Sequence, residues 1–285
     1  MSQLHILHRT AYLFARPVKF GAHRLVLHPR EGHDLRVMSM TLAVTPAHRR
    51  IWTRDVYGNS VAIIEGIEPG ERLEIVSDVT VQRYPPFPAQ DLHQPWRVSY
   101  PFVYEPMEQA VAAAYQVSSY GSELDKVASW LDQILPAEKR MDAEEMLLAL
   151  SIEIKQQIRY VRRTEKGVQS PAQTLALSSG SCRDMATLMM EAARQLNVAG
   201  RFVSGYLHGS ASMSGNASTH AWMEAYLPGL GWRGFDPTLG EPTSLKHVPI
   251  GVSHHPRGVM PVTGTFDGVR QDFLEMQVQV RTEEV

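Results

Sequence analysis

The stretch Gly-Ser-Cys-Arg-Asp at residues 180–184 decides the fold, because it begins a helix at the only cysteine among 285 residues. The apolar residues after Cys182 recur at helical spacing, which predicts a helix whose first residue is the cysteine. Ser181 is the expected N-cap, and Asp184 completes the capping-box pattern three residues later. Because the first turn of a helix favours an anion, this position favours the thiolate form of Cys182. The pattern indicates a reactive sulfur.

Two residues downstream of the cysteine match the partners that a thiolate nucleophile needs. Such a nucleophile requires a base that takes and returns its proton, and the base requires a group that orients it. His220 opens a predicted strand over residues 219–227, and Asp236 ends a second predicted strand over residues 231–236. The link between them, Pro-Gly-Leu-Gly at 228–231, is typical of a turn. We therefore expect a hairpin that carries both His220 and Asp236.

The pairing register of this hairpin decides whether the two side chains meet. If Leu227 pairs with Trp232, the aspartate lies on the opposite face from His220. If Tyr226 pairs with Trp232 instead, the aspartate lies diagonal to the histidine on one face, about 7–8 Å away between backbones. The two side chains can bridge that distance. We expect the second register, with a five-residue loop or a bulge between the strands.

Three blocks of sequence resemble the bacterial transglutaminase-like cysteine peptidase superfamily. They are Gly-Ser-Cys-Arg-Asp at 180–184, His-Ala-Trp-Met-Glu-Ala-Tyr at 220–226 and Gly-Trp-Arg-Gly-Phe-Asp-Pro-Thr at 231–238. The resemblance implies a papain/transglutaminase-like core, in which the catalytic cysteine starts a helix that packs on an antiparallel sheet. It also implies that Cys182 is the nucleophile, His220 the base and Asp236 the residue that orients the base.

Residues 1–83 are predicted to form a separate all-β domain. Six short runs with partial apolar alternation are separated by predicted turns, and one of these turns is at Pro17. This spacing is typical of a small β-sandwich. Residues 9–18 and 23–30 are also similar to the N-terminal region that often precedes the catalytic core in the bacterial family. The expected fold is thus α+β, with a β-sandwich-like domain ahead of the core.

Residues 84–106 are predicted to connect this domain to a catalytic domain over residues 107–285. The connection contains six of the 18 prolines, which prevent regular strand pairing and stiffen the path. We therefore expect an ordered strap. Helices are predicted to follow over residues 108–117 and 124–135.

A third helix, predicted over residues 142–161, is expected to support the cysteine helix. Asp142 is its expected N-cap. Apolar residues at intervals of four form one stripe along it, namely Met146, Leu150, Ile154 and Ile158. We expect the cysteine helix to pack on this stripe.

Two segments near the site are predicted to be loops. Residues 209–218 are rich in Ser, Gly and Asn and directly precede His220, which is typical of a lid over a cleft. Residues 239–268 contain four prolines, and the part over 247–268 lacks some of the pattern that the family shows here. Residues 273–280 alternate and predict a closing strand.

Composition limits the partners and the compartment. The 44% hydrophobic and 20% charged content is typical of a globular chain with a core. A net charge of −2 without basic runs argues against nucleic acid or an anionic membrane surface as partner. A single cysteine excludes an intramolecular disulfide and favours a reducing compartment. With no signal-peptide pattern and no membrane-length apolar run, we expect a cytoplasmic location.

Other residues near the three blocks have both a structural and a functional interpretation. Asp184 is favoured as a helix cap over a role in chemistry. Arg183 is equally consistent with binding a substrate carboxylate and with a solvated helix position. Trp222 could shield the histidine and aspartate, although an aromatic residue in a strand is more often core. Tyr160 and Tyr206 are weaker hypotheses for residues that line a substrate pocket.

No metal and no cofactor are predicted. His254 and His255 are adjacent, and adjacent residues of an extended segment point to opposite faces, so such a pair rarely binds one ion. The sequence also lacks the spacings typical of zinc ligands and a glycine-rich phosphate loop.

The expected reaction is acyl transfer on an amide or peptide bond through a thioester on Cys182. The backbone N–H of this cysteine is the expected oxyanion donor. If water resolves the thioester, the protein is a cysteine peptidase or amidase, which we prefer because no calcium-loop pattern is evident. If an amine resolves it, the protein is a transglutaminase. A third hypothesis is a non-catalytic binding module on the same fold. The expected partner is a peptide, a protein or a small amide substrate.

Overall fold

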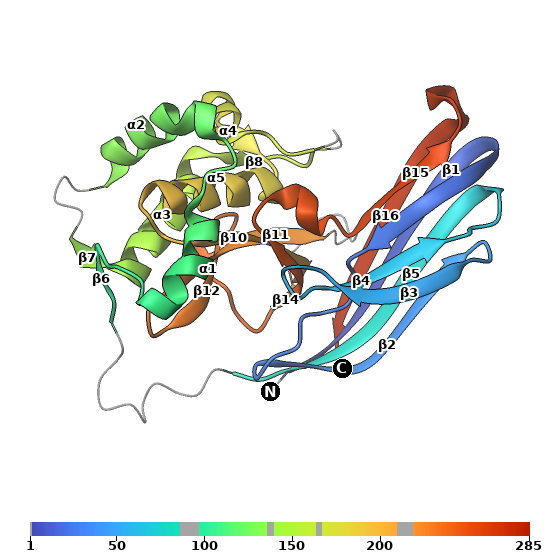
Figure 1. Cartoon of the computed structure of the whole chain (residues 1–285), viewed down its shortest axis with the longest axis horizontal. Helices are drawn as coiled ribbons and strands as arrows, with labels where there is room; N and C mark the ends of the chain where they lie inside the picture. The colour runs from blue at the N-terminus through green and yellow to red at the C-terminus, as the bar shows by residue number, and fades with distance from the viewer. Residues whose placement is uncertain (1, 86–96, 136–139, 164–166, 210–218) are drawn as a thin grey trace.

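The computed structural model describes residues 2–85, 97–135, 140–163, 167–209 and 219–285. Figure 1 shows a strand-rich region beside a region of helices around a smaller sheet. The fold is therefore the predicted α+β fold. Among the helices within these ranges, none is long and apolar enough to cross a membrane.

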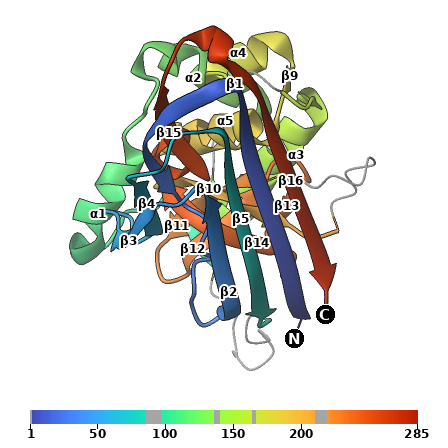
Figure 2. The same ribbon diagram turned by 90° about the vertical axis from the view of Figure 1, so that its right-hand side faces the viewer.

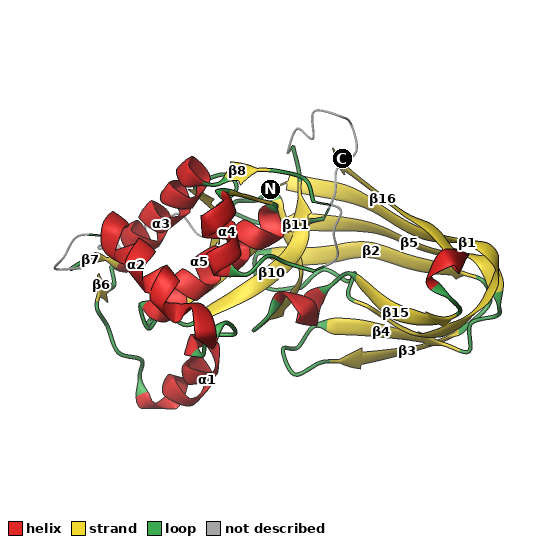
Figure 3. Ribbon diagram, turned by 90° about the horizontal axis from the view of Figure 1, so that it is seen from above, coloured by secondary structure: helices red, strands yellow, loops and turns green. Residues whose placement is uncertain are grey.

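Seven described antiparallel strands form the strand-rich region: β1 (Ser2–Leu25), β2 (Leu35–Thr45), β3 (Arg49–Arg54), β4 (Ser60–Glu65), β5 (Gly70–Arg83), β15 (Val262–Asp267) and β16 (Phe273–Glu284). The long β1 organises them. Its first half lies between β5 and β16, and its second half lies between β4 and β15. Figure 3 shows the two layers that result, with β1 passing from one to the other. Strands β2 and β3 lie at the two ends of the strand order.

The predicted turn at Pro17 is wrong, because β1 continues through it. The pairing of β1 with β5 shifts register between Leu13 and Val18, so the strand bends through an irregularity at this place. Proline lacks the N–H that a regular ladder needs, and such irregularities tolerate it. The bend carries β1 from one layer to the other and produces the predicted sandwich-like form.

The last two strands pair with β1, which differs from the predicted limits of the catalytic domain. β16 runs from Glu284 opposite Leu4 to Phe273 opposite Phe14, and Figure 2 shows β1, β16 and the two ends of the chain side by side. Residues 262–284 are thus part of the strand-rich sheet, although the prediction grouped them with residues 107–285. Local alternation predicted the strand at 273–280 correctly, but it cannot identify a partner at the other end of the chain.

Helices packed on a five-stranded antiparallel sheet form the second region. The helices are α1 (Pro106–Gln116), α2 (Leu124–Ile134), α3 (Ala143–Gln157), α4 (Pro171–Leu177) and α5 (Cys182–Gln195). The sheet has the order β13-β12-β11-β10-β14, with β10 (Gly200–Leu207), β11 (His220–Leu227), β12 (Gly231–Asp236), β13 (Glu241–Pro242) and β14 (His247–Ser253). Two short pairs complete it, β6 (Ser99–Tyr100) with β7 (Met141–Asp142) and β8 (Arg159–Tyr160) with β9 (Ser179–Gly180). Single 3₁₀ turns are η2 (Gly121–Glu123), η3 (Pro256–Val259) and η4 (Arg270–Asp272).

Helix α5 is the centre of the second region. Twelve of its 14 residues are buried, so its position is held on nearly every side. The apolar stripe of α3 is buried in the same cluster as Met185 and Met189 of α5, as predicted. Asp142 caps α3 by accepting hydrogen bonds from two backbone N–H groups, also as predicted, although the helix ends at Gln157 and not at residue 161. A helix held in this way presents its first residue at a fixed place.

The two regions share an apolar cluster and a buried polar contact. Side chains of β1 and β5 pack against Tyr206, Val248 and Ile250 of the smaller sheet. Asn59, which is fully buried, accepts from the backbone N–H of Val252 at 2.9 Å and donates to the backbone oxygen of the same residue at 2.8 Å. This amide therefore continues the hydrogen bonding of β14 into the strand-rich region.

Two of the predicted segments lie partly outside the described residues. Of the strap over residues 84–106, residues 86–96 are outside, whereas Val98, Tyr100, Phe102 and Tyr104 pack against the apolar clusters of the helical region. There Tyr104 is buried, donates to the backbone oxygen of Tyr226 at 3.0 Å and accepts from the N–H of Ala199 at 2.8 Å. The predicted lid at 209–218 lies outside the described residues except for Gly209.

Candidate active site

Cys182 is the first residue of α5, as the sequence predicted, and 7% of its surface is exposed. Ser181 precedes it in extended conformation as the N-cap. The carboxylate of Asp184 accepts hydrogen bonds from both the backbone N–H and the hydroxyl of Ser181, each at 2.8 Å. The local sequence therefore fixes the turn that carries the sulfur.

Asp184 acts as a structural cap. Besides Ser181, it accepts from Arg163 Nη1 at 2.8 Å and from the backbone N–H of Gln169 at 2.7 Å, and it is fully buried. Gly180 is required beside it, since a Cβ at that position would approach the Asp184 Cβ to 2.9 Å. With its oxygens occupied in this way, Asp184 serves the backbone of the turn.

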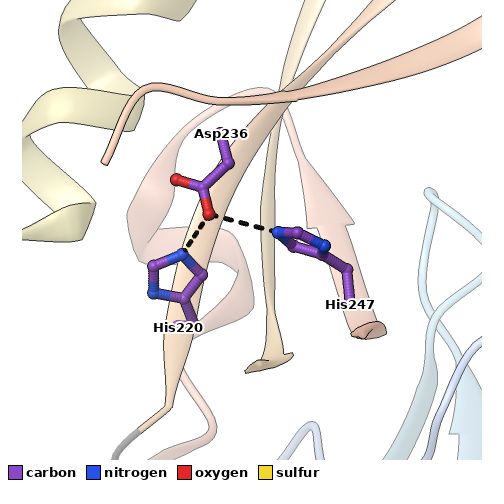
Figure 4. Close-up of side chains that lie close together, drawn as sticks. All are labelled: His220, Asp236 and His247. Atoms are coloured by element: carbon purple, nitrogen blue, oxygen red, sulfur yellow. Dashed lines mark hydrogen bonds and ion pairs between the residues drawn. The ribbon is translucent and has the colours of Figure 1, made fainter. Parts of the chain in front are cut away.

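His220 and Asp236 meet across the hairpin of β11 and β12. Tyr226 pairs with Trp232, which is the register predicted from sequence. The loop is tighter than predicted, because Leu227 and Gly231 also pair and leave three residues between them. In this register His220 Nε2 lies 2.6 Å from Asp236 Oδ2, as Figure 4 shows.

Cys182 lies close enough to the His220 ring to influence the pKa of the imidazole. Because Nε2 is bonded to Asp236, Nδ1 is the ring nitrogen left for the cysteine. Burial disfavours the charged ring, but hydrogen bonds to Asp236 and to Cys182 outweigh it and raise the pKa of His220 to about 10. The raised pKa favours the imidazolium form of the ring beside the buried Asp236 carboxylate.

Asp236 is fully buried and every one of its close partners donates a hydrogen bond. Oδ1 accepts from the backbone N–H of Thr238 at 2.9 Å. Oδ2 accepts from His220 and also from His247 Nε2, the latter at 3.1 Å. Burial opposes ionisation, but the bonds from His220 and His247 hold the pKa of Asp236 below its usual range. The carboxylate is thus fixed in place and charged.

His247 is a site residue that the sequence reasoning missed. It is buried at the start of β14, inside the segment that was predicted to be loop, and its ring contacts Trp222 edge-on at 5.2 Å. Its Nδ1 accepts the backbone N–H of Ser244 at 3.0 Å, so the ring proton resides on Nε2 and is donated to Asp236. The signal available in the sequence was a histidine eleven residues after the Asp236 block.

The rings of His220 and His247 and the Asp236 carboxylate also form a compact set of metal-ligand atoms, all within 4.8 Å of one another. Hydrogen bonding already explains why these atoms lie close together, since the Nε2 atoms of both rings bond to Asp236 Oδ2. The absence of a metal stays a prediction. His254 and His255 use their Nε2 atoms separately, on the backbone oxygen of Val117 and on the Tyr120 hydroxyl.

Four other residues named from sequence are placed as follows. Trp222 is buried and stacks near His220, at 6.3 Å between ring centroids, so it is core and also shields the imidazole. Tyr160 is 49% exposed and pairs with Gly180, which brings it beside the cysteine turn. Burial raises its pKa, and the charge of Cys182 adds to the effect.

The remaining two differ in outcome. Arg183 is partly exposed in the first turn of α5, and both of its interpretations stay open. The suggestion that Tyr206 lines a pocket is wrong. Its ring is fully buried between the two regions, and its hydroxyl bonds to His8 Nδ1 at 2.9 Å.

Comparisons with known proteins match two parts of the chain. Residues 4–82 match the bacterial transglutaminase-like N-terminal region, and residues 130–237 match the transglutaminase-like superfamily. An uncharacterised protein of Mycobacterium leprae is 22% identical over 98% of this chain and 99% of its own length. One of Mycobacterium bovis is 27% identical over 91% of this chain and 86% of its own.

One solved structure covers nearly the whole chain. It is a candidate cysteine protease from Cytophaga hutchinsonii, and it aligns with a TM-score of 0.74 over 99% of this chain and 90% of its own. Its sequence is 18% identical, so the likeness shows the fold alone. The arrangement of both regions is therefore shared with a known structure.

Proposed function

This chain belongs with the bacterial transglutaminase-like proteins, and from that premise we propose that it catalyses thiol-dependent acyl transfer on amide or peptide bonds. The observation that carries the proposal is the His220 ring, which is bonded to the buried Asp236 and lies close enough to Cys182 for the cysteine to influence its pKa. A nucleophile, a base and an orienting carboxylate in that order form the general arrangement for covalent catalysis.

The chemistry follows from these positions. The Cys182 thiolate attacks the carbonyl carbon, and the oxyanion forms beside the backbone N–H of the same residue at the start of α5. His220 gives its proton to the nitrogen of the leaving amine, and the C–N bond breaks to leave a thioester on the sulfur. The neutral ring then takes a proton from the attacking water, and the acid leaves as the thiolate returns. Asp236 keeps the proton on Nε2 and the ring aligned throughout.

We favour water over an amine as the second nucleophile, which makes the enzyme a cysteine peptidase or amidase. The likeness to a candidate cysteine protease supports this choice at the level of fold. The alternative, a transglutaminase, uses the same three residues. Incubation of a glutamine-rich protein with a labelled primary amine separates the two: release of ammonia without incorporated label is expected, and incorporated label would assign the transferase.

Alkylation by iodoacetamide tests the nucleophile directly, because the chain has one sulfur that can react as a thiol. We expect Cys182 to be labelled rapidly between pH 6 and 7, where an ordinary thiol is largely unreactive. His220→Gln should slow this labelling because the thiolate loses its cationic partner, whereas His33→Gln, in an exposed loop, should not. Labelling that is equally slow in all three proteins would instead favour a non-catalytic binding module.

We further propose a cytoplasmic location, which the single free cysteine supports. Cell fractionation followed by immunodetection tests it. Recovery of the protein with a periplasmic marker would contradict the proposal.

A further inference from the structure

The strand-rich region contains an open groove of about 610 Å³, which we call the β2–β3 groove. Its walls include Met40 and Leu42 of β2, Arg50, Trp52 and Arg54 of β3, and His28. The volume lies in the ordinary range for ligand sites. None of the residues around Cys182 contributes to it, so the acyl-transfer chemistry does not explain it.

The ionisable side chains that line the groove are all basic. Arg50, Arg54 and His28 line it, and its described lining residues include no carboxylate. Side chains alternate along a strand, so Arg50, Trp52 and Arg54 share the face turned to the groove. Arg49 lies on the other face of the same strand and is paired with Glu65. The chain as a whole has a net charge of −2, so this local excess of cations is not a general property.

Arg50 is held ready for an anion. Its Nη2 donates to His48 Nε2 at 3.3 Å, and His48 is fixed in turn by a bond from Nδ1 to the backbone oxygen of Pro46. The Nε of Arg50 is buried and has no acceptor among the described residues. A buried donor without a partner is unfavourable, and a carboxylate that binds the guanidinium edge would satisfy it.

The groove also offers features that suit an extended chain. The described part of the sheet ends at β2 and β3, and each has one strand neighbour, so each presents an edge with unpaired backbone groups. Trp52 is 47% exposed and, with Met40, provides an apolar surface between the cations. Peptides that add to such edges gain backbone hydrogen bonds and place alternate side chains into pockets.

We propose that the β2–β3 groove binds an extended acidic peptide segment of a protein partner. Aspartate or glutamate carboxylates bind Arg50 and Arg54, and an apolar side chain between them lies against Trp52. Peptide is favoured over nucleic acid because two arginines and one histidine make a small footprint for a polyphosphate, and the chain is not basic overall.

Fluorescence anisotropy with the full-length protein tests this assignment. The probe is a labelled hexapeptide, Glu-Val-Phe-Val-Glu-Val, which places both glutamates and the phenylalanine on one face of a strand, with the Lys-Val-Phe-Val-Lys-Val peptide as its charge-reversed control. We expect the acidic peptide to bind and the basic one not to bind. Arg50→Gln should weaken binding about 10-fold or more, Arg54→Gln a little less, and the matched Arg49→Gln on the opposite face less than about 2-fold.

Two further variants distinguish a specific loss of peptide binding from a loss of folding. Arg50→Lys keeps the charge but loses the guanidinium edge, so it should weaken binding nearly as much as Arg50→Gln. Trp52→Ala removes the apolar contact and leaves every charge in place. Unchanged iodoacetamide labelling of Cys182 in each variant shows that the fold is retained.

Several outcomes would overturn the assignment. Equal weakening by Arg49→Gln and Arg50→Gln would show that net charge, and not the groove, binds the peptide. Tighter binding of a single-stranded oligonucleotide would assign the groove to nucleic acid. Free glutamate binding as well as the hexapeptide would assign it to a small dicarboxylate, and binding that is unaffected by every variant would place the peptide elsewhere.

Discussion

The candidate active site and the β2–β3 groove differ in how their polar atoms are satisfied. At the site, the carboxylates of Asp184 and Asp236 each accept several hydrogen bonds, and His220 Nε2 is bonded to Asp236. In the groove, Arg50 has a buried N–H without an acceptor, and no carboxylate faces it. The polar atoms of the site are thus satisfied before substrate arrives, whereas the groove has a donor that a partner can satisfy.

The largest effect is expected for removal of the sulfur at the active site. Cys182→Ala should lower amide or peptide hydrolysis by about 10⁴-fold or more, because no other group can form the thioester. The same variant should bind the acidic hexapeptide as wild type does. Initial rates and anisotropy measured on one preparation check both statements. A variant that loses peptide binding together with activity would show that the two places act as one.

A second, smaller effect is expected when His247 is replaced. His247→Leu should lower kcat about 10- to 100-fold with little change in KM, because Asp236 loses one of the donors that fix it. His247→Gln retains a donor near the position of Nε2 and should recover part of the rate. Steady-state kinetics of the two variants give the result. Equal loss in both, or a rise in KM alone, would contradict a positioning role.

A third change tests the contact between the two regions. Asn59→Ala leaves the N–H and the oxygen of Val252 without their partner in a buried place, which should cost about 2–3 kcal/mol of unfolding free energy. Denaturant unfolding of wild type and variant measures it. Gln109→Ala, at an exposed position of α1, is the control and should change the free energy of unfolding by less than about 0.5 kcal/mol. Cys182 should still be labelled at the wild-type rate in the folded variant.

The smallest expected effect is a dependence of stability on pH. The pKa of His220 is raised from its ordinary value of 6.5 to about 10 in the folded state. Protonation therefore stabilises the folded form fully below about pH 6.5, and the stabilisation is lost as the pH rises toward 10. The melting temperature of wild type minus that of His220→Gln should fall across this interval. A difference that grows with pH would mean that the folded ring is neutral.

The sequence predicted the site better than its surroundings, for reasons that are local. The cap at Ser181 and the Tyr226–Trp232 register depend on residues close in sequence, so pattern reading recovers them. His247 was missed because Pro249 argued against a strand. β14 lies at the end of its sheet, and its pairing with β10 shifts register beside Pro249, so the proline is tolerated there.

The predicted boundary of the N-terminal domain did not include β15 and β16, for a different reason. Pairing of β16 with β1 joins residues from the two ends of the chain, and no local pattern reports such a partner. The groove was not foreseen either, since it exists only after β1 has bent and brought β2 and β3 to opposite ends of one sheet. What the sequence cannot show is therefore geometry created by distant pairing.

The position of β15 and β16 beside β1 has a consequence for synthesis on the ribosome. Residues 2–83 emerge before residues 262–284, so one flank of β1 has no neighbour until residues 262–284 have been translated. During that interval the nascent chain exposes an open strand edge, which is the kind of surface on which incomplete proteins associate. The helices around the cysteine need no later strand. A ribosome stalled before residue 262 should thus carry a formed helical core on an unfinished sheet, and the chain is expected to need chaperone protection until β15 and β16 have been made.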